Sequence, residues 1–472
     1  MPGSTKLPPY RLLPEPPLAF GDGRPQARHL HPLLGLLEHG PYSKSAFAIL
    51  KPKLRVATIT PEDAQAHVFQ FLKSLQNEHK PRERKDYLPA FAGFEAVFGV
   101  PIHGAHREAH VTLPSDTVTA DQGDMHSLGE ALRRGLDRLQ SMRDEFDVVA
   151  IYLPDRWQPG FEDLERGLDL HHEIKSFAAV AGLSTQFLQE SRALSYFDRC
   201  SVAWRLGIAF YAKAGGTPWR LVPNAADTAY IGLSYAIRGG TTDKFVTCCS
   251  QVFDADGGGM EFVAYDVGDG VDFENPFLSR ADMRAVMSRS LAVYQGRNAG
   301  RLPRRVVIHK TQAFRDEEVD GCIDAWGRTD EIECVQVVTS NDWRAVRLLG
   351  ARTKDALSTP DSWPVERGTL VPFSDRSVLL FINGDAPSVA VRGHYVQGGK
   401  GIPRPITLVR HAGAGPLERL GEDALALSKM DWNNDALFDS LPVTIEYSKR
   451  LSQTIAHATS LPSGTYPYRL FM

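Results

Sequence analysis

A run of polar residues directly follows a short apolar segment in the second half of the chain. Residues 306–308, Val-Val-Ile, predict a buried strand, and His309, Lys310 and Thr311 come at once after it. In α/β proteins, chemical groups gather at the carboxyl ends of buried strands. The stretch therefore marks a place where a site is expected, and its residue types decide what chemistry that site can perform.

The elements around this stretch follow a recognisable order. Apolar runs, glycine-rich turns and two helical patterns predict seven elements. They are strands at 229–237, 245–253 and 260–267, a helix at 279–295, the strand ending at 308, a helix at 314–326 and a strand at 332–340. Three antiparallel strands, then helix, strand, helix and strand, is the connectivity of the ribonuclease H fold.

The first half of the chain has a different pattern, in which strands and helices alternate. The predicted elements are a strand at 54–59 with Thr60 as the N-cap of the next helix, a strand at 146–154, a helix at 169–182, a short strand at 184–190 and a long helix from Ser195 to Lys213. Such alternation predicts a parallel, Rossmann-like sheet covered on both faces. We divide the chain into a proline-rich strap (1–45), a Rossmann-like domain (46–222) and a ribonuclease H-like domain (223–472).

Composition limits the class of protein. The chain has 472 residues, a formal net charge of -4 and 43% hydrophobic residues, which suits globular domains and does not favour indiscriminate coating of nucleic acid. No run of about 18 apolar residues predicts a membrane span, and the proline-rich N-terminus lacks the apolar core of a signal peptide. We expect a cytoplasmic protein.

Enzymes of the ribonuclease H fold hold two divalent metal ions with several carboxylates, and the metals activate water and stabilise the leaving oxygen. The first carboxylate belongs in the middle of the first strand, where this chain has Ser234. Another belongs at the end of the fourth strand, where it has Thr311. Neutral hydroxyls are poor ligands for a hard divalent ion compared with carboxylates. The sequence therefore predicts a degenerate metal site without catalytic residues.

Other acidic residues offer an alternative. Asp254, Asp256, Asp266 and Asp269 lie near turns of the same domain. A relocated carboxylate set among them would restore a nuclease, although acids at such positions are more often turn-formers and solvated loop residues.

Several motifs together resemble the short prokaryotic Argonautes, which contain only MID and PIWI domains. The motifs are HHEIK (171–175), WRLGIAFYAKAGGTPWRL (204–221), AYIGLSYAI (229–237), RVVIHKT (305–311) and the late segment LSKMDWNND…LPVTIEYSKRLS. The resemblance implies a Rossmann-like MID domain followed by a ribonuclease H-like PIWI domain. Argonautes that slice carry Asp at the places of Ser234 and Thr311, so it also implies an inactive PIWI domain.

The resemblance also implies a site for the 5′ phosphate of a guide strand. The matching positions are His171, Lys175, Gln186 and Lys213. His171 and Lys175 are four residues apart and share a helix face, two lysines can neutralise a phosphate, and a glutamine can donate to its oxygens. His172 competes with His171 for its role, and Lys213 could instead serve only the helix C-terminus.

The apolar end of the chain, YPYRLFM, predicts a buried tail. In similar proteins the terminal carboxylate approaches the guide phosphate through a divalent ion. The resemblance implies that Met472 supplies this carboxylate to Mg²⁺, since carboxylate and phosphate oxygens are both hard ligands. The alternative is a hydrophobic tail packed on the PIWI core.

These features predict a guide-binding subunit of prokaryotic antiviral defence without slicing activity. The resemblance implies a guide RNA, a single-stranded DNA target and a partner protein that substitutes for the missing PAZ region and carries a sirtuin-like or TIR NADase or a nuclease. The alternatives are an active guide-directed nuclease with relocated carboxylates and a non-guided scaffold subunit.

Overall fold

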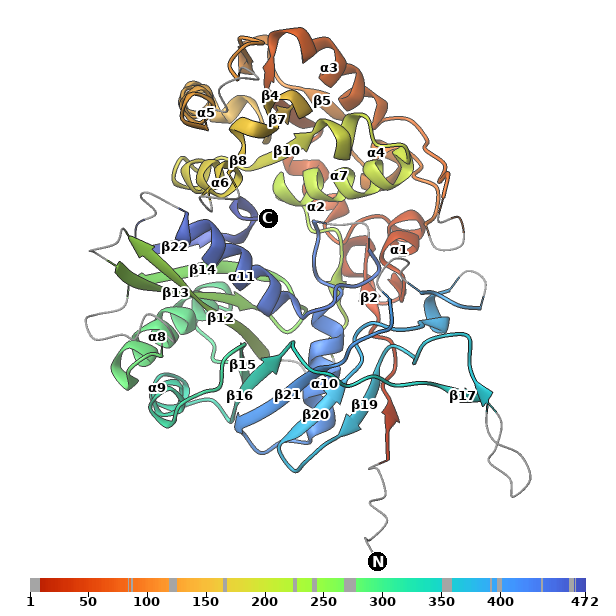
Figure 1. Ribbon diagram of the computed structural model, residues 1–472, viewed down its shortest axis with the longest axis vertical. Coiled ribbons are helices and arrows are strands. Elements are labelled where there is room, and N and C mark those ends of the chain that lie inside the picture. Colours follow the sequence, from red (N-terminus) through yellow and green to blue (C-terminus); the bar gives the residue numbers. More distant parts are fainter. Residues whose placement is uncertain are drawn as a thin grey trace, which may run out of the picture.

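The structure is a computed structural model of the chain. Two lobes lie one above the other in Figure 1, and the C-terminus lies between them, below helix α6 (Leu170–Val180). The structure describes residues 9–472 with the exception of residues 84, 86, 87, 119–124, 164–167, 224–226, 240–243, 267–276, 350–358, 391, 392, 397–400, 434, 435, 458–461 and 463.

The first lobe is built on a sheet of five parallel strands. They are β4 (Leu54–Pro61), β5 (Ile102–Gly104), β6 (His110–Leu113), β7 (Val148–Leu153) and β10 (Thr185–Gln189). The order is β10-β7-β4-β5, and β6 also pairs with β4. Every residue of β7 is buried, as expected for a central strand with helices on both faces. The predicted Rossmann-like sheet is confirmed.

Two predicted helix starts are wrong in this lobe. Thr60 does not cap a helix, because β4 continues through it and Thr60 pairs with Thr112 of β6. The helix α3 begins only at Gln65 and ends at Ser74. The long helix α7 (Arg199–Lys213) begins after Asp198, whose carboxylate accepts hydrogen bonds from the backbone N–H groups of Cys200 and Ser201. No helix in the described part of the chain is long and apolar enough to cross a membrane.

The second lobe contains a ten-stranded sheet with the order β1-β19-β20-β21-β16-β15-β12-β13-β14-β22. Its strands are β1 (Arg11–Leu12), β12 (Thr228–Gly239), β13 (Lys244–Phe253), β14 (Gly259–Asp266), β15 (Arg305–Lys310), β16 (Glu331–Val338), β19 (Thr369–Pro372), β20 (Ser377–Leu380), β21 (Ile406–Ala412) and β22 (Gly464–Pro467). The first three long strands are antiparallel, and β12, β15 and β16 are parallel. This is the predicted ribonuclease H connectivity.

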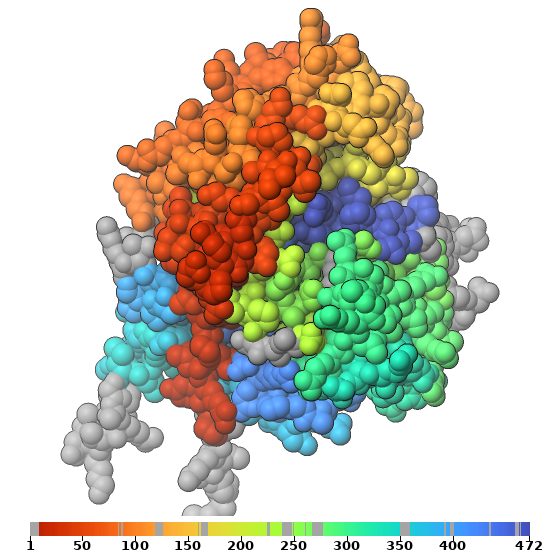
Figure 2. Space-filling view, turned by 180° about the vertical axis from the view of Figure 1, so that it is seen from behind, coloured from red at the N-terminus to blue at the C-terminus, as the bar shows by residue number. Residues whose placement is uncertain are grey.

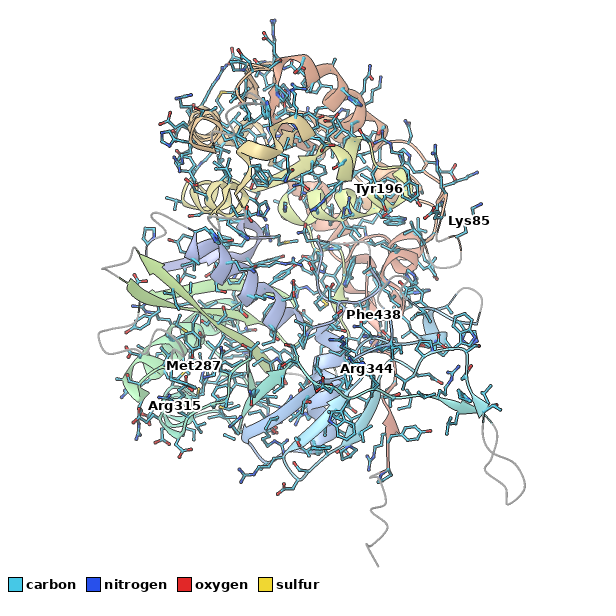
Figure 3. All side chains as sticks on the ribbon, in the orientation of Figure 1. Lys85, Tyr196, Met287, Arg315, Arg344 and Phe438 are labelled. Carbon is cyan, nitrogen blue, oxygen red and sulfur yellow. The ribbon has the colours of Figure 1, made fainter. Side chains whose placement is uncertain are left out.

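Helices cover both faces of this sheet. Helices α8 (Arg280–Arg297) and α9 (Asp316–Trp326) share one core with β12 and β15. Figure 3 labels Met287 of α8 and Arg315, which directly precedes α9. Helix α11 (Val443–Ala456) packs on the opposite face, where a Cβ atom at Gly232 would overlap the carbonyl oxygen of Thr444. Helix α10 (Leu417–Leu427) packs against β20.

The N-terminal segment runs along both lobes, and Figure 2 shows it in red on the surface. Strand β1 extends the large sheet by pairing with β19, and β2 (Leu18–Ala19) pairs with β3 (Arg28–His29) and β11 (Arg220–Leu221). The buried carboxylate of Glu15 binds Arg367 and Lys429, at 2.8 Å in each case. The domain boundaries at residues 45 and 222 stay predictions.

Candidate nucleic-acid interface

A cavity at the boundary between the lobes contains all the residues that were predicted to bind a phosphate. Its volume is about 370 Å³, and His171, Lys175, Gln186 and Lys213 line it. They come from α6, β10 and α7 of the first lobe, and Asn433 of the second lobe completes the wall. Segments that are far apart in the sequence thus converge on one pocket.

Lys213 lies at the last residue of α7, and its side chain is almost completely buried. Its Nζ donates to the carbonyl oxygen of Thr185 at 2.9 Å and to Oε1 of Gln186 at 2.6 Å. Nε2 of Gln186 donates to the carbonyl oxygen of Phe187 at 3.0 Å. In this structure Gln186 therefore orients Lys213, and its amide would have to leave Phe187 to donate to a phosphate.

Lys175 joins the pocket to the end of the chain. Its Nζ donates to the carbonyl oxygen of Phe471 at 3.3 Å and to the main-chain oxygen of Met472. Met472 is 1% exposed. Burial, with a smaller contribution from Arg450, lowers the pKa of Lys175 to about 7. Burial and the neighbouring Lys175 also lower the pKa of Lys213 well below its ordinary value.

The two histidines of the HHEIK motif have different surroundings. His171 lines the cavity, and its ring packs against Phe187 with 4.8 Å between centroids. Burial, followed by Lys175, lowers the pKa of His171 well below its ordinary value, so its ring is neutral. His172 instead hydrogen-bonds Thr454 and does not line the cavity. Of the two candidates, the structure places His171 in the pocket.

Two arginines that were not predicted from the sequence also line the cavity. They are Arg192, which follows β10, and Arg205 of α7. Nη2 of Arg205 donates to the carbonyl oxygen of Arg192 at 2.7 Å, which ties the two together. Arg205 precedes Lys213 by eight residues, a spacing that brings side chains to one helix face and could have revealed it. Arg192 has no such sequence signal.

The two positions of the predicted degenerate metal site, Ser234 and Thr311, lie in the second lobe. Leu233 of β12 pairs with Lys310 of β15 in parallel register, so Ser234 and Thr311 follow side by side. The Ser234 hydroxyl donates to the carbonyl oxygen of Ser448, and Thr311 Oγ1 donates to Oε1 of Gln312 at 3.0 Å. Within the described residues, no group of three or more metal-ligating side chains occurs at these positions.

The polar residues next to these positions are buried and form hydrogen bonds within the lobe. Both carboxylate oxygens of Glu318 accept from Nζ of Lys310, at 2.8 and 2.6 Å, and both side chains are completely buried. Nδ1 of His309 lies 2.8 Å from Oγ1 of Thr444, and burial lowers the pKa of His309 to about 3. Both Lys310 and His309 are thus buried in the lobe and hydrogen-bonded to neighbouring side chains.

The alternative acids lie elsewhere in the sheet. Asp254 and Asp256 belong to the turn between β13 and β14, next to the start of β12, whereas Thr311 lies toward the other end of that strand. Asp256 is paired with Arg220. Asp266 ends β14, which is separated from β12 by β13. Asp269 lies outside the described residues.

Comparisons with known proteins show which proteins the chain resembles. No protein-family model matches the chain. It is 24% identical over 456 residues to the protein argonaute of Cereibacter sphaeroides (strain ATCC 17025 / ATH 2.4.3). The chain is an Argonaute homologue. The alignment covers 91% of this chain and 54% of that protein, so the chain spans about half the length of the curated relative.

Solved Argonaute structures share its fold. The TM-score is 0.64 with Aa-Ago with externally bound siRNA (14% identity, covering 99% of this chain and 56% of that one). The TM-score is also 0.64 with Clostridium butyricum Argonaute bound to a guide DNA and a 19-mer target DNA (15% identity, covering 98% of this chain and 54% of that one). It is 0.63 with Drosophila Piwi (12% identity, covering 98% of this chain and 55% of that one). The predicted MID–PIWI fold class is confirmed.

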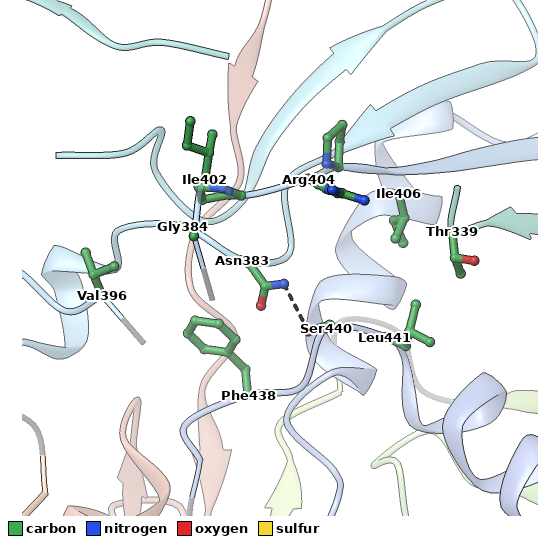
Figure 4. Close-up of a pocket in the computed structure, with 13 residues that line it drawn as sticks. Thr339, Asn383, Gly384, Val396, Ile402, Arg404, Ile406, Phe438, Ser440 and Leu441 are labelled. Carbon is green, nitrogen blue, oxygen red and sulfur yellow. Dashed lines mark hydrogen bonds between the residues drawn. The ribbon is translucent and has the colours of Figure 1, made fainter. Parts of the chain in front are cut away.

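A second cavity lies in the second lobe, which has the ribonuclease H connectivity and is called the PIWI-like lobe below; Figure 4 shows this cavity. Its volume is about 400 Å³, and Val396, Ile406, Phe438 and Leu441 supply apolar walls. Nδ2 of Asn383 donates to the Ser440 hydroxyl at 3.0 Å. Arg404 is the one cationic residue among its lining residues, so this cavity is far less suited to a phosphate than the pocket between the lobes.

The low pKa of Lys175 leads to a testable pH dependence. A phosphate binds the ammonium form, which the free protein loses as the pH rises through about 7. Binding above this pH therefore requires proton uptake, while the phosphate is already a dianion. We expect the affinity for a 5′-phosphorylated oligonucleotide to fall by up to about tenfold per pH unit between pH 7 and 9.

Fluorescence anisotropy at constant ionic strength measures this slope. The Lys175→Met variant is the control, since the contribution of Lys175 to the slope must disappear in it. An affinity that is constant from pH 7 to 9 in the unmodified chain would contradict the expected proton uptake.

Proposed function

We propose that this chain holds the 5′-phosphorylated end of a guide RNA and uses it to bind complementary single-stranded DNA, without cleaving it. The observation that supports this proposal most directly is the pocket, in which Lys175, Lys213 and His171 lie together with two arginines. Buried cations form strong charge-assisted hydrogen bonds with phosphate oxygens, and a terminal phosphate brings nearly two negative charges. Its charge would match that of the two lysines once both are protonated.

The surroundings of the lysines favour a strand end over an internal phosphate. Lys175 and Lys213 are each at most 5% exposed, and the buried main chain of Met472 contacts Lys175. A phosphate that reaches both ammonium groups must enter a recess in which a second nucleotide has little room. Base pairing then supplies sequence recognition, as in other guided systems.

The proposed Mg²⁺ is compatible with this pocket but would find few protein ligands. Met472 supplies the one carboxylate considered for it, and Lys175 already binds a main-chain oxygen of this residue. Mg²⁺ commonly combines one or two carboxylates with phosphate oxygens and water. An ion here would therefore be held by the second oxygen of Met472 and by the guide phosphate, and it would add a further positive charge to the pocket.

We further propose that target binding activates an effector on a partner protein, an NADase or a nuclease, in prokaryotic immunity. A surface suited to a partner supports this. Large apolar side chains are 40–65% exposed around β17 (Leu348–Leu349) and its partner β18 (Thr359–Pro360), and β17 projects from the lobe in Figure 1. They are Trp343, Val346, Leu348, Leu349 and Trp363. Exposed apolar groups of this kind mark protein interfaces.

A programmed capture assay tests the proposal. The chain is loaded with a 5′-phosphorylated RNA and incubated with complementary or scrambled single-stranded DNA in Mg²⁺ or Mn²⁺. We expect selective retention of the complementary strand and no cleavage products, because hydroxyls stand at positions 234 and 311.

Two results would overturn parts of this account. Equal retention of both DNA strands would contradict guide-directed binding and favour a scaffold. Metal-dependent cuts that disappear on Asp254→Ala or Asp256→Ala would show a relocated nuclease site.

A further inference from the structure

A second cluster of potential ligands lies at the start of α6. The side chains of Asp169, His171 and His172 each present one ligand atom, and the three atoms lie within 4.8 Å of one another. Within the described residues, no other group of three or more His, Cys, Asp or Glu side chains has this geometry. All three side chains are half-buried, so they are not ordinary solvated surface groups.

Local structure explains why residues so close in sequence converge. Asp169 is the N-cap of α6, and its Oδ1 accepts from the backbone N–H of His171 at 2.8 Å. This bond leaves Oδ2 above the first helical turn. There Oδ2 lies 3.6 Å from Nε2 of His172.

The hydrogen-bond network fixes the protonated nitrogen of His172. The Thr454 hydroxyl donates its only proton to the carbonyl oxygen of Arg450 at 3.0 Å, so it must accept from Nδ1 of His172 at 3.1 Å. The neutral ring then carries its proton on Nδ1 and a lone pair on Nε2. A nitrogen lone pair therefore faces a carboxylate oxygen with no proton between them.

We propose that Asp169, His171 and His172 bind a divalent transition-metal ion such as Zn²⁺. Two imidazoles and one carboxylate are a favourable ligand set for this ion, and a fourth position stays open. Ligand atoms around tetrahedral zinc are roughly 3.3 Å apart, so the pair of Asp169 and His172 needs little movement. Thr454 serves as the outer partner that orients a ligating histidine.

The position of this site connects it to the pocket. Asp169 and His171 also line the phosphate cavity, so the proposed site borders that space. The site differs from the proposed Mg²⁺ site in its ligands, which include two nitrogens and exclude Met472. Lys175 and Lys213 oppose a cation here, and the charge of Asp169 offsets part of that repulsion.

Co²⁺ and Zn²⁺ titrations of the purified, metal-free chain test the site without nucleic acid. We expect one equivalent of Co²⁺ to bind with the absorption spectrum of a histidine-ligated ion and to be displaced by Zn²⁺. Asp169→Asn retains the helix cap, whereas it removes the charged ligand; His172→Gln removes a nitrogen ligand. Each should weaken binding at least about tenfold, and Thr454→Val should weaken it less.

His126→Gln is the matched control, because His126 lies 3.1 Å from Glu130 on the same lobe but outside the cluster. It should bind the metal as the unmodified chain does. Circular dichroism confirms that each variant is folded. No stoichiometric binding by the unmodified chain, or equal affinity in Asp169→Asn and His172→Gln, would overturn the assignment. Either result would leave guide binding untouched, since the titration contains no guide.

Discussion

Replacing Lys175 or Lys213 with methionine should weaken binding of a 5′-phosphorylated oligonucleotide by about 10- to 100-fold, because each removes one charge-assisted hydrogen bond worth about 1.5–3 kcal/mol. The double variant should bind phosphorylated and 5′-hydroxyl strands equally. Methionine fills similar space in the buried pocket and carries no charge. Binding of the 5′-hydroxyl strand should change little in any variant.

The pair of oligonucleotides separates this effect from general loss of affinity. Lys80→Met is the protein control, since the Lys80 side chain is 78% exposed and lies outside the pocket. Thermal unfolding checks that the buried substitutions leave the lobe folded, because Lys213→Met leaves acceptors on Thr185 and Gln186 without their donor. An undiminished preference for the 5′ phosphate in the folded double variant would refute the assignment of both lysines.

Glu318→Gln should lower the free energy of unfolding of the PIWI-like lobe by about 3–5 kcal/mol, because it leaves the buried Lys310 without its counter-charge. The carboxylate of Glu318 also accepts from the hydroxyl of Tyr235 at 3.0 Å and from the backbone N–H of Arg315 at 2.9 Å. An amide can accept through only one atom, so part of this network is lost as well.

Urea unfolding followed by fluorescence measures the change. Asp330→Asn is the matched control, since Asp330 pairs with Arg304 at 3.1 Å with both side chains more than two-thirds exposed. Such surface pairs contribute about 0–1 kcal/mol. If Glu318→Gln cost no more than the control, the ion pair at the end of β15 would not stabilise the lobe, and these residues would be free for another role.

The fold was predictable from local patterns for a physical reason. Strand alternation, glycine turns and helix caps depend on residues that are close in sequence. These local patterns were enough to predict the ribonuclease H order of elements from β12 to β16. The predictions failed where distant segments decide the outcome. Thr60 remains in β4 because β6 pairs with it, and β1 joins β19 across most of the chain length.

The site was partly predictable. Helical spacing and family resemblance led to His171, Lys175, Gln186 and Lys213, which the structure brings together. The sequence could not show that Gln186 binds Lys213 or that Lys175 meets the end of the chain, because these contacts depend on tertiary packing. The approach of His172 to Asp169 likewise depends on Thr454 of α11, which lies 282 residues away.

The most direct test of the account is the analysis of nucleic acid that accompanies the chain when it is purified from cells, alone and with its genomic neighbour. Extracted material would be labelled at its 5′ ends with and without prior phosphatase, sized, and treated with RNase or DNase. Guide binding predicts short RNA of narrow length with 5′ phosphates, which is absent from the Lys175→Met, Lys213→Met double variant. Recovery of no short nucleic acid, together with failure to acquire an added 5′-phosphorylated guide, would contradict the guide-binding function.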